Sequence, residues 1–304
     1  MFPRPASNTM ERENKLLLFF TLLVIIGLGT AFYWIKARPE RVGFVVQSES
    51  SRDKTAREKF QEVPILTDDT LAKNDAVEHL SYEVHFPRVL LASDTSLAKE
   101  ANAVIRAFVN DQIDDFKKNA ADGSAADKSK DASSEFSMRW SSEMLSPTIL
   151  SLRFDYSEYI EGAAHPNTAS RILNYDLKRH LLLPTGALFA SSTQALPFLS
   201  SYSRKALHTI LAGISSDEFA SQVIPGTEPI SDNFEAVALT KAGLLIIFNP
   251  YQVAPYARGA VQVEVPLADV VELISPEARD AMRMASDNIV EATEETTTNP
   301  KMEQ

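Results

Sequence analysis

The chain has 304 residues, of which 44% are hydrophobic and 23% charged, so it can form a sizeable core and is not disordered throughout. Its formal net charge of −11 argues against nucleic-acid binding, which requires a basic surface. The absence of cysteine excludes disulfides, thiolate zinc sites, iron–sulfur clusters and a cysteine nucleophile.

Residues 16–35 form an uninterrupted apolar run, LLLFFTLLVIIGLGTAFYWI. At about 1.5 Å per residue, a helix of this length spans the roughly 30 Å hydrocarbon core of a bilayer. Tyr33 and Trp34 stand at the end of the run, where amphipathic rings favour the membrane interface. The run is longer than the apolar stretch of a cleaved signal peptide, and no small-residue cleavage pattern follows it. We therefore expect an uncleaved transmembrane helix at 16–35, preceded by a short cytoplasmic tail at 1–15.

Charge does not orient this span. Basic residues precede it (Arg4, Arg12 and Lys15) and follow it (Lys36, Arg38 and Arg41) in equal number, so the positive-inside rule gives a tie. Residues 36–75 are polar, highly charged and without clear periodicity, which indicates a juxtamembrane spacer.

The folded part is predicted to begin at Val77, with a small N-terminal α/β subdomain at 77–134. Within residues 77–92, Tyr82, Val84 and Phe86 alternate with polar residues, which is the period of a half-buried strand. Residues 96–120 carry one apolar stripe at helical spacing, with Ser96 as the expected N-cap. A charged loop of small residues follows at 122–134.

Residues 135–285 are predicted to form an α+β domain. Three alternating runs at 135–183 indicate an antiparallel meander, and residues 192–214 indicate a second amphipathic helix. Further strands are expected at 234–240, 243–249 and 260–266, followed by a short helix at 267–274. Long alternation of parallel strands and helices is absent, so the predicted fold class is α+β, with antiparallel sheets and packed amphipathic helices. The acidic, threonine-rich residues 286–304 are expected to be disordered.

The sequence contains no motif that is typical of catalysis or of metal binding. There is no P-loop, G-x-G-x-x-G, H-E-x-x-H or G-x-S-x-G. His79 and His85 are six residues apart on a predicted strand, roughly 20 Å at about 3.3 Å per residue, which is too far for one metal ion. We therefore predict no metal and no cofactor, and we do not assign an enzymatic activity.

The first candidate site is the turn at 161–167, where small residues lie between Glu161 and His165 and Asn167 follows. A tight turn brings Glu161 and His165 close together, as an acid–base pair or as ligand-binding groups. The structural alternative is a turn whose histidine hydrogen-bonds backbone groups of the loop.

The second candidate site is the loop at 249–259, with two Pro-Tyr units and Arg258. Tyr251 and Tyr256 offer flat aromatic surface for a sugar or peptide, or they hold the loop on its own sheet. Because neither loop carries a nucleophile or a metal-ligand set, we hypothesise that Glu161, His165, Asn167, Tyr251, Tyr256 and Arg258 form one binding surface rather than an active site.

The segments EYIEGAAHPNTASRILNYDLKRHLLLPTGALF and FNPYQVAPYARGAVQVEVPLADV, with YEVHFP upstream, resemble a known extracytoplasmic bacterial domain of unknown function. That domain forms the outer part of RsiV-type anti-sigma factors, which are lysozyme receptors, and a non-catalytic module of PdaC-type peptidoglycan deacetylases. The resemblance implies an α+β fold at 77–274 and an extracytoplasmic location for the part after the span. It implies no catalytic residue. Only 14 residues precede Lys15, fewer than a sigma-binding segment needs, and the metal motifs of a deacetylase domain are absent.

The favoured function is therefore a single-pass, membrane-anchored binding domain of the bacterial cell envelope. Its expected partners are the membrane and a cell-wall glycan, a peptidoglycan-related ligand or a lysozyme-like protein, with no nucleic acid. Two alternatives stay open: a transmembrane signalling subunit, and an envelope polysaccharide-modifying enzyme that uses Glu161 and His165.

Overall fold

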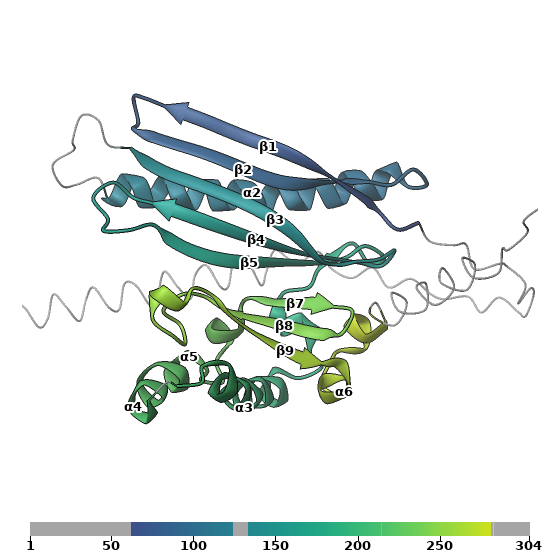
Figure 1. Ribbon diagram of the computed structural model, residues 1–304. Helices are drawn as coiled ribbons and strands as arrows, with labels where there is room; N and C mark the ends of the chain where they lie inside the picture. The colour runs from purple at the N-terminus through teal and green to yellow at the C-terminus, as the bar shows by residue number, and fades with distance from the viewer. Residues whose placement is uncertain (1–61, 124–132, 214, 281, 283–304) are drawn as a thin grey trace, which may run out of the picture. The chain divides into compact units, whose positions relative to one another are not determined.

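The larger sheet of the computed structural model contains six strands that lie side by side in chain order (Figure 1). The structure describes residues 62–123, 133–213, 215–280 and 282. The strands are β1 (Ile65–Asp75), β2 (Leu80–Leu90), β3 (Ser134–Leu145), β4 (Ile149–Tyr159), β5 (Asn167–Asp176) and β6 (Leu181–Leu182). The predicted meander at 135–183 is confirmed as β3, β4, β5 and the short β6.

The predicted α+β class with antiparallel sheets is confirmed, except that one pair of neighbours in this sheet is parallel. β2 and β3 run in the same direction, from Leu80 opposite Ser134 to Val84 opposite Met138. Between them stands α2 (Thr95–Gly123), which returns the chain to the end of the sheet where β2 began. Parallel strands need such a crossover, whereas the other neighbouring pairs are antiparallel.

α2 is the predicted first amphipathic helix, and it lies along one face of the six-stranded sheet (Figure 1). Its buried residues recur every three or four positions: Ala98, Ala101, Ile105, Val109, Ile113, Phe116 and Ala120. The ring of Phe116 stacks on that of Phe136 in β3, with centroids 5.3 Å apart. The helix begins one residue before the predicted cap: the Leu97 N–H donates to Asp94 Oδ1 at 2.9 Å, so Asp94 rather than Ser96 caps it.

β1 corrects two predictions: the spacer at 36–75 ends before Ile65, and the folded part begins before Val77. The structure pairs all 11 residues of β1 with β2, from Ile65 opposite Leu90 to Asp75 opposite Leu80. Each β1 residue is exposed or half-buried. The strand therefore lacks the apolar alternation by which a half-buried strand is detected.

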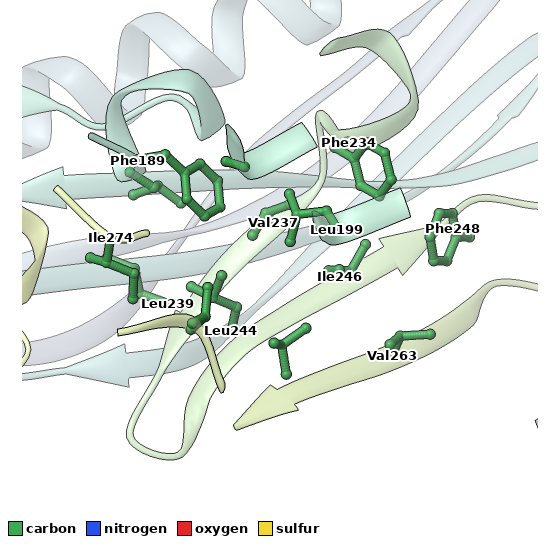
Figure 2. Packing of buried hydrophobic residues seen from close by; sticks show 14 of the residues in the cluster. Phe189, Leu199, Phe234, Val237, Leu239, Leu244, Ile246, Phe248, Val263 and Ile274 are labelled. Atoms are coloured by element: carbon green, nitrogen blue, oxygen red, sulfur yellow. The ribbon is translucent and has the colours of Figure 1, made fainter. Parts of the chain in front are cut away.

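The second sheet has three antiparallel strands, β7 (Val237–Thr240), β8 (Gly243–Phe248) and β9 (Val261–Pro266), which confirms the three predicted strands. One face packs with α3 (Ser192–Ile210), the predicted second helix, and Figure 2 shows Leu199, Ile246 and Phe248 in this core. Gly243 closes the β7–β8 hairpin at φ 147°, where a Cβ atom would lie 2.1 Å from the Val265 carbonyl oxygen. Only glycine fits there.

The remaining described elements are short helical turns. Residues 221–233 contain helical turns, and the predicted helix at 267–274 is reduced to one turn. The turns are α4 (Ser216–Glu218), a π-helical turn (Phe219–Val223), α5 (Ile224–Gly226), α6 (Leu267–Val270) and 3-10 turns at Thr185–Leu188, Ser231–Phe234 and Tyr256–Arg258.

The two sheets meet through β5 and β7. Ala236, Ala238, Leu245 and Ile247, on the second face of the small sheet, pack against Ile172 of β5. The buried Asn174 side chain donates to the Val237 carbonyl at 2.8 Å and accepts from the Leu239 N–H at 3.2 Å. The described residues lie within one compact unit, Lys59–Gln304. The predicted boundary between 134 and 135 falls inside β3, because that strand pairs with β2 across it.

The predicted tail at 1–15, the apolar run at 16–35, most of the spacer and the tail at 286–304 lie outside the described residues. Within the described part of the chain, no helix has the length and hydropathy needed to cross a membrane.

Candidate functional site

Three of the predicted site residues lie in the turn between β4 and β5 or at the start of β5. The Ala163 N–H donates to the Ile160 carbonyl at 2.9 Å, and Gly162 adopts φ 88°, which closes the turn. The backbone N–H of Glu161 donates to Ser134 Oγ at 3.1 Å. His165 is exposed at the turn, and Asn167 is the first residue of β5, opposite Glu158.

The loop at 249–260, between β8 and β9, is fixed at its base by polar side chains. Asn249 Oδ1 accepts from the Ser170 N–H at 2.7 Å, and Asn249 Nδ2 donates to the Ser170 carbonyl at 3.4 Å. Gln252 Nε2 donates to the carbonyls of Gly226 and Asn233, at 3.2 and 2.9 Å. Val253 and Ala254 are buried in the core of the small sheet. The loop is therefore held in one position while its tyrosines reach the surface.

The two candidate loops meet in a cluster of three rings, His165, Tyr251 and Tyr256, called here the three-ring cluster. The ring centroids of His165 and Tyr256 are 4.4 Å apart, and those of Tyr251 and Tyr256 are 5.4 Å apart. Tyr251 is 61% exposed and has a positive φ of 70°, which is unusual for a residue other than glycine. The structure thus joins these three predicted site residues, although they come from different sheets.

Hydrogen bonds hold the rings in place. The Pro166 carbonyl accepts from Tyr256 Oη at 2.8 Å and from His165 Nδ1 at 2.9 Å. Since a carbonyl only accepts, Nδ1 carries a proton, and Nε2 lies within hydrogen-bond distance of Tyr251 Oη, at 3.2 Å. Both ring nitrogens therefore have partners other than Glu161. The predicted Glu161–His165 acid–base pair is not formed.

Arg258, the last predicted site residue, is not a member of the three-ring cluster. It belongs to the 3-10 turn Tyr256–Arg258, and its charge acts on Glu218 in α4. The pKa of Glu218 is lowered first by hydrogen bonds from the backbone and side chain of Ser215, and further by the positive charge of Arg258.

Two hollows adjoin the candidate loops. The β1-side hollow, about 570 Å³, is lined by residues of β1 to β4 and by Pro166. The β5-side hollow, about 410 Å³, is lined by residues of β3 to β5 and by Pro250 and Ala260 of the second loop. Both include Ser137 and Ser157, so they adjoin one another across β3 and β4.

A polar network outside the predicted site residues lies beside the β5-side hollow. Arg153 donates through Nε to Asp155 at 2.8 Å and through a terminal nitrogen to Ser170 Oγ at 3.2 Å. Ser170 Oγ in turn donates to Asp155, and the Ser170 backbone holds Asn249. The polar positions 151, 153, 155 and 157 of β4 alternate with apolar ones, and this pattern was the available signal.

A second polar cluster lies on β1 and β2. His85 Nδ1 is 2.8 Å from Asp68 Oδ2, and its Nε2 is 2.9 Å from Glu83 Oε1. Hydrogen bonds, first with Asp68 and then with Glu83, raise the pKa of His85. The pKa of Asp68 is lowered by its hydrogen bonds with His85 and with Trp140 Nε1. Across the described residues, no group of three or more histidine and acidic side chains is arranged to hold a metal ion.

Two family models match the chain. The model described as "Deacetylase PdaC" matches residues 73–168, and the model described as "Protein of unknown function (DUF3298)" matches residues 186–268. The predicted resemblance to the PdaC-type module is thereby confirmed, whereas the resemblance to RsiV-type proteins stays a prediction. Residues 169–185 separate the two matched regions. The first candidate loop lies in one matched region and the second candidate loop in the other.

Two solved structures share this fold. A DUF3298-family protein from Bacteroides fragilis is 16% identical, with 72% of this chain and 98% of that chain covered and a TM-score of 0.50. A DUF3298-family protein from Pseudomonas aeruginosa is 12% identical, with the same coverage and a TM-score of 0.51. At such identities the likeness shows the fold alone. No curated protein matches the chain.

Proposed function

We propose that this chain is a membrane-anchored, extracytoplasmic protein of the bacterial envelope that binds a cell-wall glycan at the three-ring cluster. The observation that carries the proposal is the cluster itself. Two loops from different sheets, each fixed at its base, present His165, Tyr251 and Tyr256 together at the surface. A structural role alone would not require a tyrosine that is 61% exposed at a positive φ.

A sugar suits this surface chemically. Aromatic rings offer flat apolar faces against which the C–H groups of a sugar ring pack, and the polar tips of Tyr and His supply hydrogen bonds. Hydroxyl side chains of the adjoining hollows, such as Ser137, Ser157 and Thr168, match the hydroxyl groups of a glycan. The match to the PdaC model and the resemblance to a module of peptidoglycan deacetylases support a ligand of the cell wall.

The same resemblance and the apolar run at 16–35 support the proposed location. We expect the N-terminus in the cytoplasm and the described residues outside. Fusions of alkaline phosphatase and of green fluorescent protein at Gln304 test this topology. Phosphatase activity without fluorescence is the expected result, and fluorescence without phosphatase activity would overturn the proposed location.

Binding is tested with the full chain in detergent, by co-sedimentation with purified peptidoglycan sacculi. We expect wild type to pellet with the sacculi and His165→Ala to pellet much less. His208→Ala is the matched control, because His208 is also an exposed histidine that contacts one aromatic ring, Phe219, with centroids 5.7 Å apart. Equal pelleting of wild type and His165→Ala would show that the cluster is structural.

The same protein immobilised and exposed to lysozyme tests the alternative partner. Transmembrane signalling, the second candidate from the sequence, requires a ligand to act through the span. Capture of lysozyme without capture of sacculi would favour a lysozyme-like partner, and with it the signalling alternative, over the glycan.

A further inference from the structure

A hollow of about 600 Å³, called here the α2-side hollow, lies where the N-terminal half of α2 faces β1 and β2. Much of its lining is apolar: the buried side chains of Phe86 and Ala98 line it together with Ile65 and Leu90. Ile65 is 61% exposed and Leu90 is 43% exposed, and these two residues stand opposite each other in the β1–β2 ladder. One end of the hollow is therefore an exposed apolar surface.

Two basic residues of α2, Lys99 and Arg106, line the same hollow. They are seven residues apart, which places them on one side of the helix and about 10 Å apart along its axis. The Arg106 guanidinium lies over the Phe86 ring, 4.7 Å from its centroid. Since Phe86 is four residues from Leu90 along β2, Arg106 lies farther from the apolar end of the hollow than Lys99. In the described part of the chain, neither of these basic side chains forms a hydrogen bond or an ion pair.

The acidic side chains of the hollow already have partners. The Glu62 carboxylate accepts hydrogen bonds from two backbone N–H groups of the β2–α2 connection, at 3.1 and 2.8 Å. Asp69 pairs with Arg88 at 3.0 Å. The charged residues that line the hollow are thus three positive and two negative, and Lys99 and Arg106 are the two that face it without an acidic partner among the described residues. An anionic occupant is favoured.

The last described residues lie beside the N-terminal part of α2. The Asp280 carboxylate is 3.8 Å from the Arg179 guanidinium. The residue after Arg179, His180, contacts the Glu100 carboxylate of α2, and Glu100 follows Lys99 directly in the sequence. The seven residues from 280 to 287 span up to about 23 Å when extended, so the chain after 286 begins within reach of the α2-side hollow.

Residues 286–298, SDNIVEATEETTT, are called here the acidic segment. They contain four acidic residues and no basic one, whereas residues 36–61, which precede the described part, contain seven basic and four acidic residues. Charge therefore favours the acidic segment for a basic hollow. In an extended segment alternate side chains lie on one side, so Ile289, Glu291 and Glu295 share a side, with the two carboxylates about 13 Å apart.

We propose that the acidic segment binds in an extended conformation in the α2-side hollow of its own chain. Ile289 covers the apolar end of the hollow. The Glu291 carboxylate then meets Lys99, and that of Glu295 meets Arg106, in the order in which the hollow presents them. Hydrogen bonds between a carboxylate and a cation are stronger than neutral ones, and a segment that is disordered by itself orders on such a surface. This proposal is independent of glycan binding.

Carbodiimide coupling of the full chain in detergent tests the contact, because the reagent joins an amine to a carboxylate only where the two touch. After digestion, mass spectrometry is expected to find Lys99 joined to Glu291 within single chains. Lys118, an exposed lysine near the other end of α2, is the control and should not be joined to the acidic segment. Coupling of the Lys73–Asp75 pair, 2.8 Å apart, shows that the reagent has reacted.

Arg106→Gln is expected to lower the yield of the Lys99 product severalfold, because it removes one of the two cations. Excess free peptide of residues 286–298 should compete, and the same peptide with its four acidic residues replaced by glutamine should not. Equal yields at Lys99 and Lys118, or no product at Lys99 where Lys73 has reacted, would overturn the proposal. A product found only between isotopically distinct chains would overturn it as well, by assigning the hollow to the acidic segment of a second copy.

Discussion

The phenol of Tyr256 donates a hydrogen bond to the backbone carbonyl of Pro166, at 2.8 Å and across 90 residues of chain. This bond connects a loop of the three-stranded sheet to the β4–β5 turn of the six-stranded sheet. The His165 ring packs on the same tyrosine, with centroids 4.4 Å apart. The geometry of the three-ring cluster therefore depends on contacts between distant parts of the sequence.

Tyr256→Phe removes this hydrogen bond and keeps the ring. We expect a loss of about 0.5–1.5 kcal/mol in the free energy of unfolding, as for one ordinary hydrogen bond. Urea denaturation measures the change, and co-sedimentation with sacculi measures the accompanying weakening of glycan binding. Unchanged binding would mean that the ring keeps its position without the hydroxyl.

Tyr251→Gly separates binding from stability. Glycine adopts φ 70° without steric cost, whereas a tyrosine there is disfavoured by roughly 1–2 kcal/mol, and the exposed ring buries little surface. The free energy of unfolding of the variant should lie within about 1 kcal/mol of the wild-type value, whereas most of the affinity for sacculi should be lost. A variant of normal stability and normal affinity would exclude Tyr251 from the binding surface.

Asn174→Ala should destabilise the chain by about 2–4 kcal/mol, because it leaves several buried polar groups unpaired. Asn174 Oδ1 accepts from Ser151 Oγ at 2.7 Å, and its amide bonds the backbone of Val237 and Leu239. Asn167→Ala, an exposed asparagine on the same strand, is the control and should change stability by less than about 0.5 kcal/mol. Equal effects of both substitutions in urea denaturation would show that this buried network contributes little.

Gly226→Ala should displace the candidate loop. A Cβ atom at Gly226 would lie 1.8 Å from the Gln252 carbonyl oxygen, so the backbone must shift. We expect the free energy of unfolding, measured by thermal unfolding, to fall by about 1–3 kcal/mol, and the binding of sacculi to weaken. Gly186→Ala is the control, since a Cβ atom there meets nothing within 4 Å. A normal melting temperature for Gly226→Ala would mean that the loop adapts freely.

The stability of the chain should depend on pH through His85. Its pKa in the folded chain is raised above the ordinary value of 6.5, so its stabilising contribution is complete below about pH 6.5 and is lost as pH rises through the raised pKa. The pKa values of Asp68 and Glu83 are lowered, so their contribution is lost as pH falls below about 4. The urea midpoint of wild type should therefore fall between pH 6 and pH 8.

His85→Gln should flatten that dependence. Urea midpoints of wild type and His85→Gln at pH 6, 7 and 8 make the comparison. A pH profile of His85→Gln that follows wild type would show that another group is responsible.

The candidate site could be predicted in part. His165, Tyr251 and Tyr256 were identified because small residues and Pro-Tyr units indicate loops that carry exposed aromatic side chains. Their contact was a hypothesis, since Tyr251 and His165 are 86 residues apart. The expected Glu161–His165 pair was not formed, because Pro166 and Tyr251 occupy both nitrogens of the imidazole. Nothing in the sequence indicates that the charge of Arg258 acts on Glu218 rather than joining the three-ring cluster.

The sequence by itself determined the type and position of most elements, because the spacing of apolar residues within a segment shows which face of the helix or strand is buried. The stripe of α2 and the alternation along β3 and β4 are of this kind. Tertiary structure alone decided the pairing of β1, the parallel direction of β3 beside β2, and the junction of the two loops. It also decided which charges are paired, as for Arg153 with Asp155. Those features depend on backbone hydrogen bonds and ion pairs between residues far apart in the chain, and no local pattern encodes such partners.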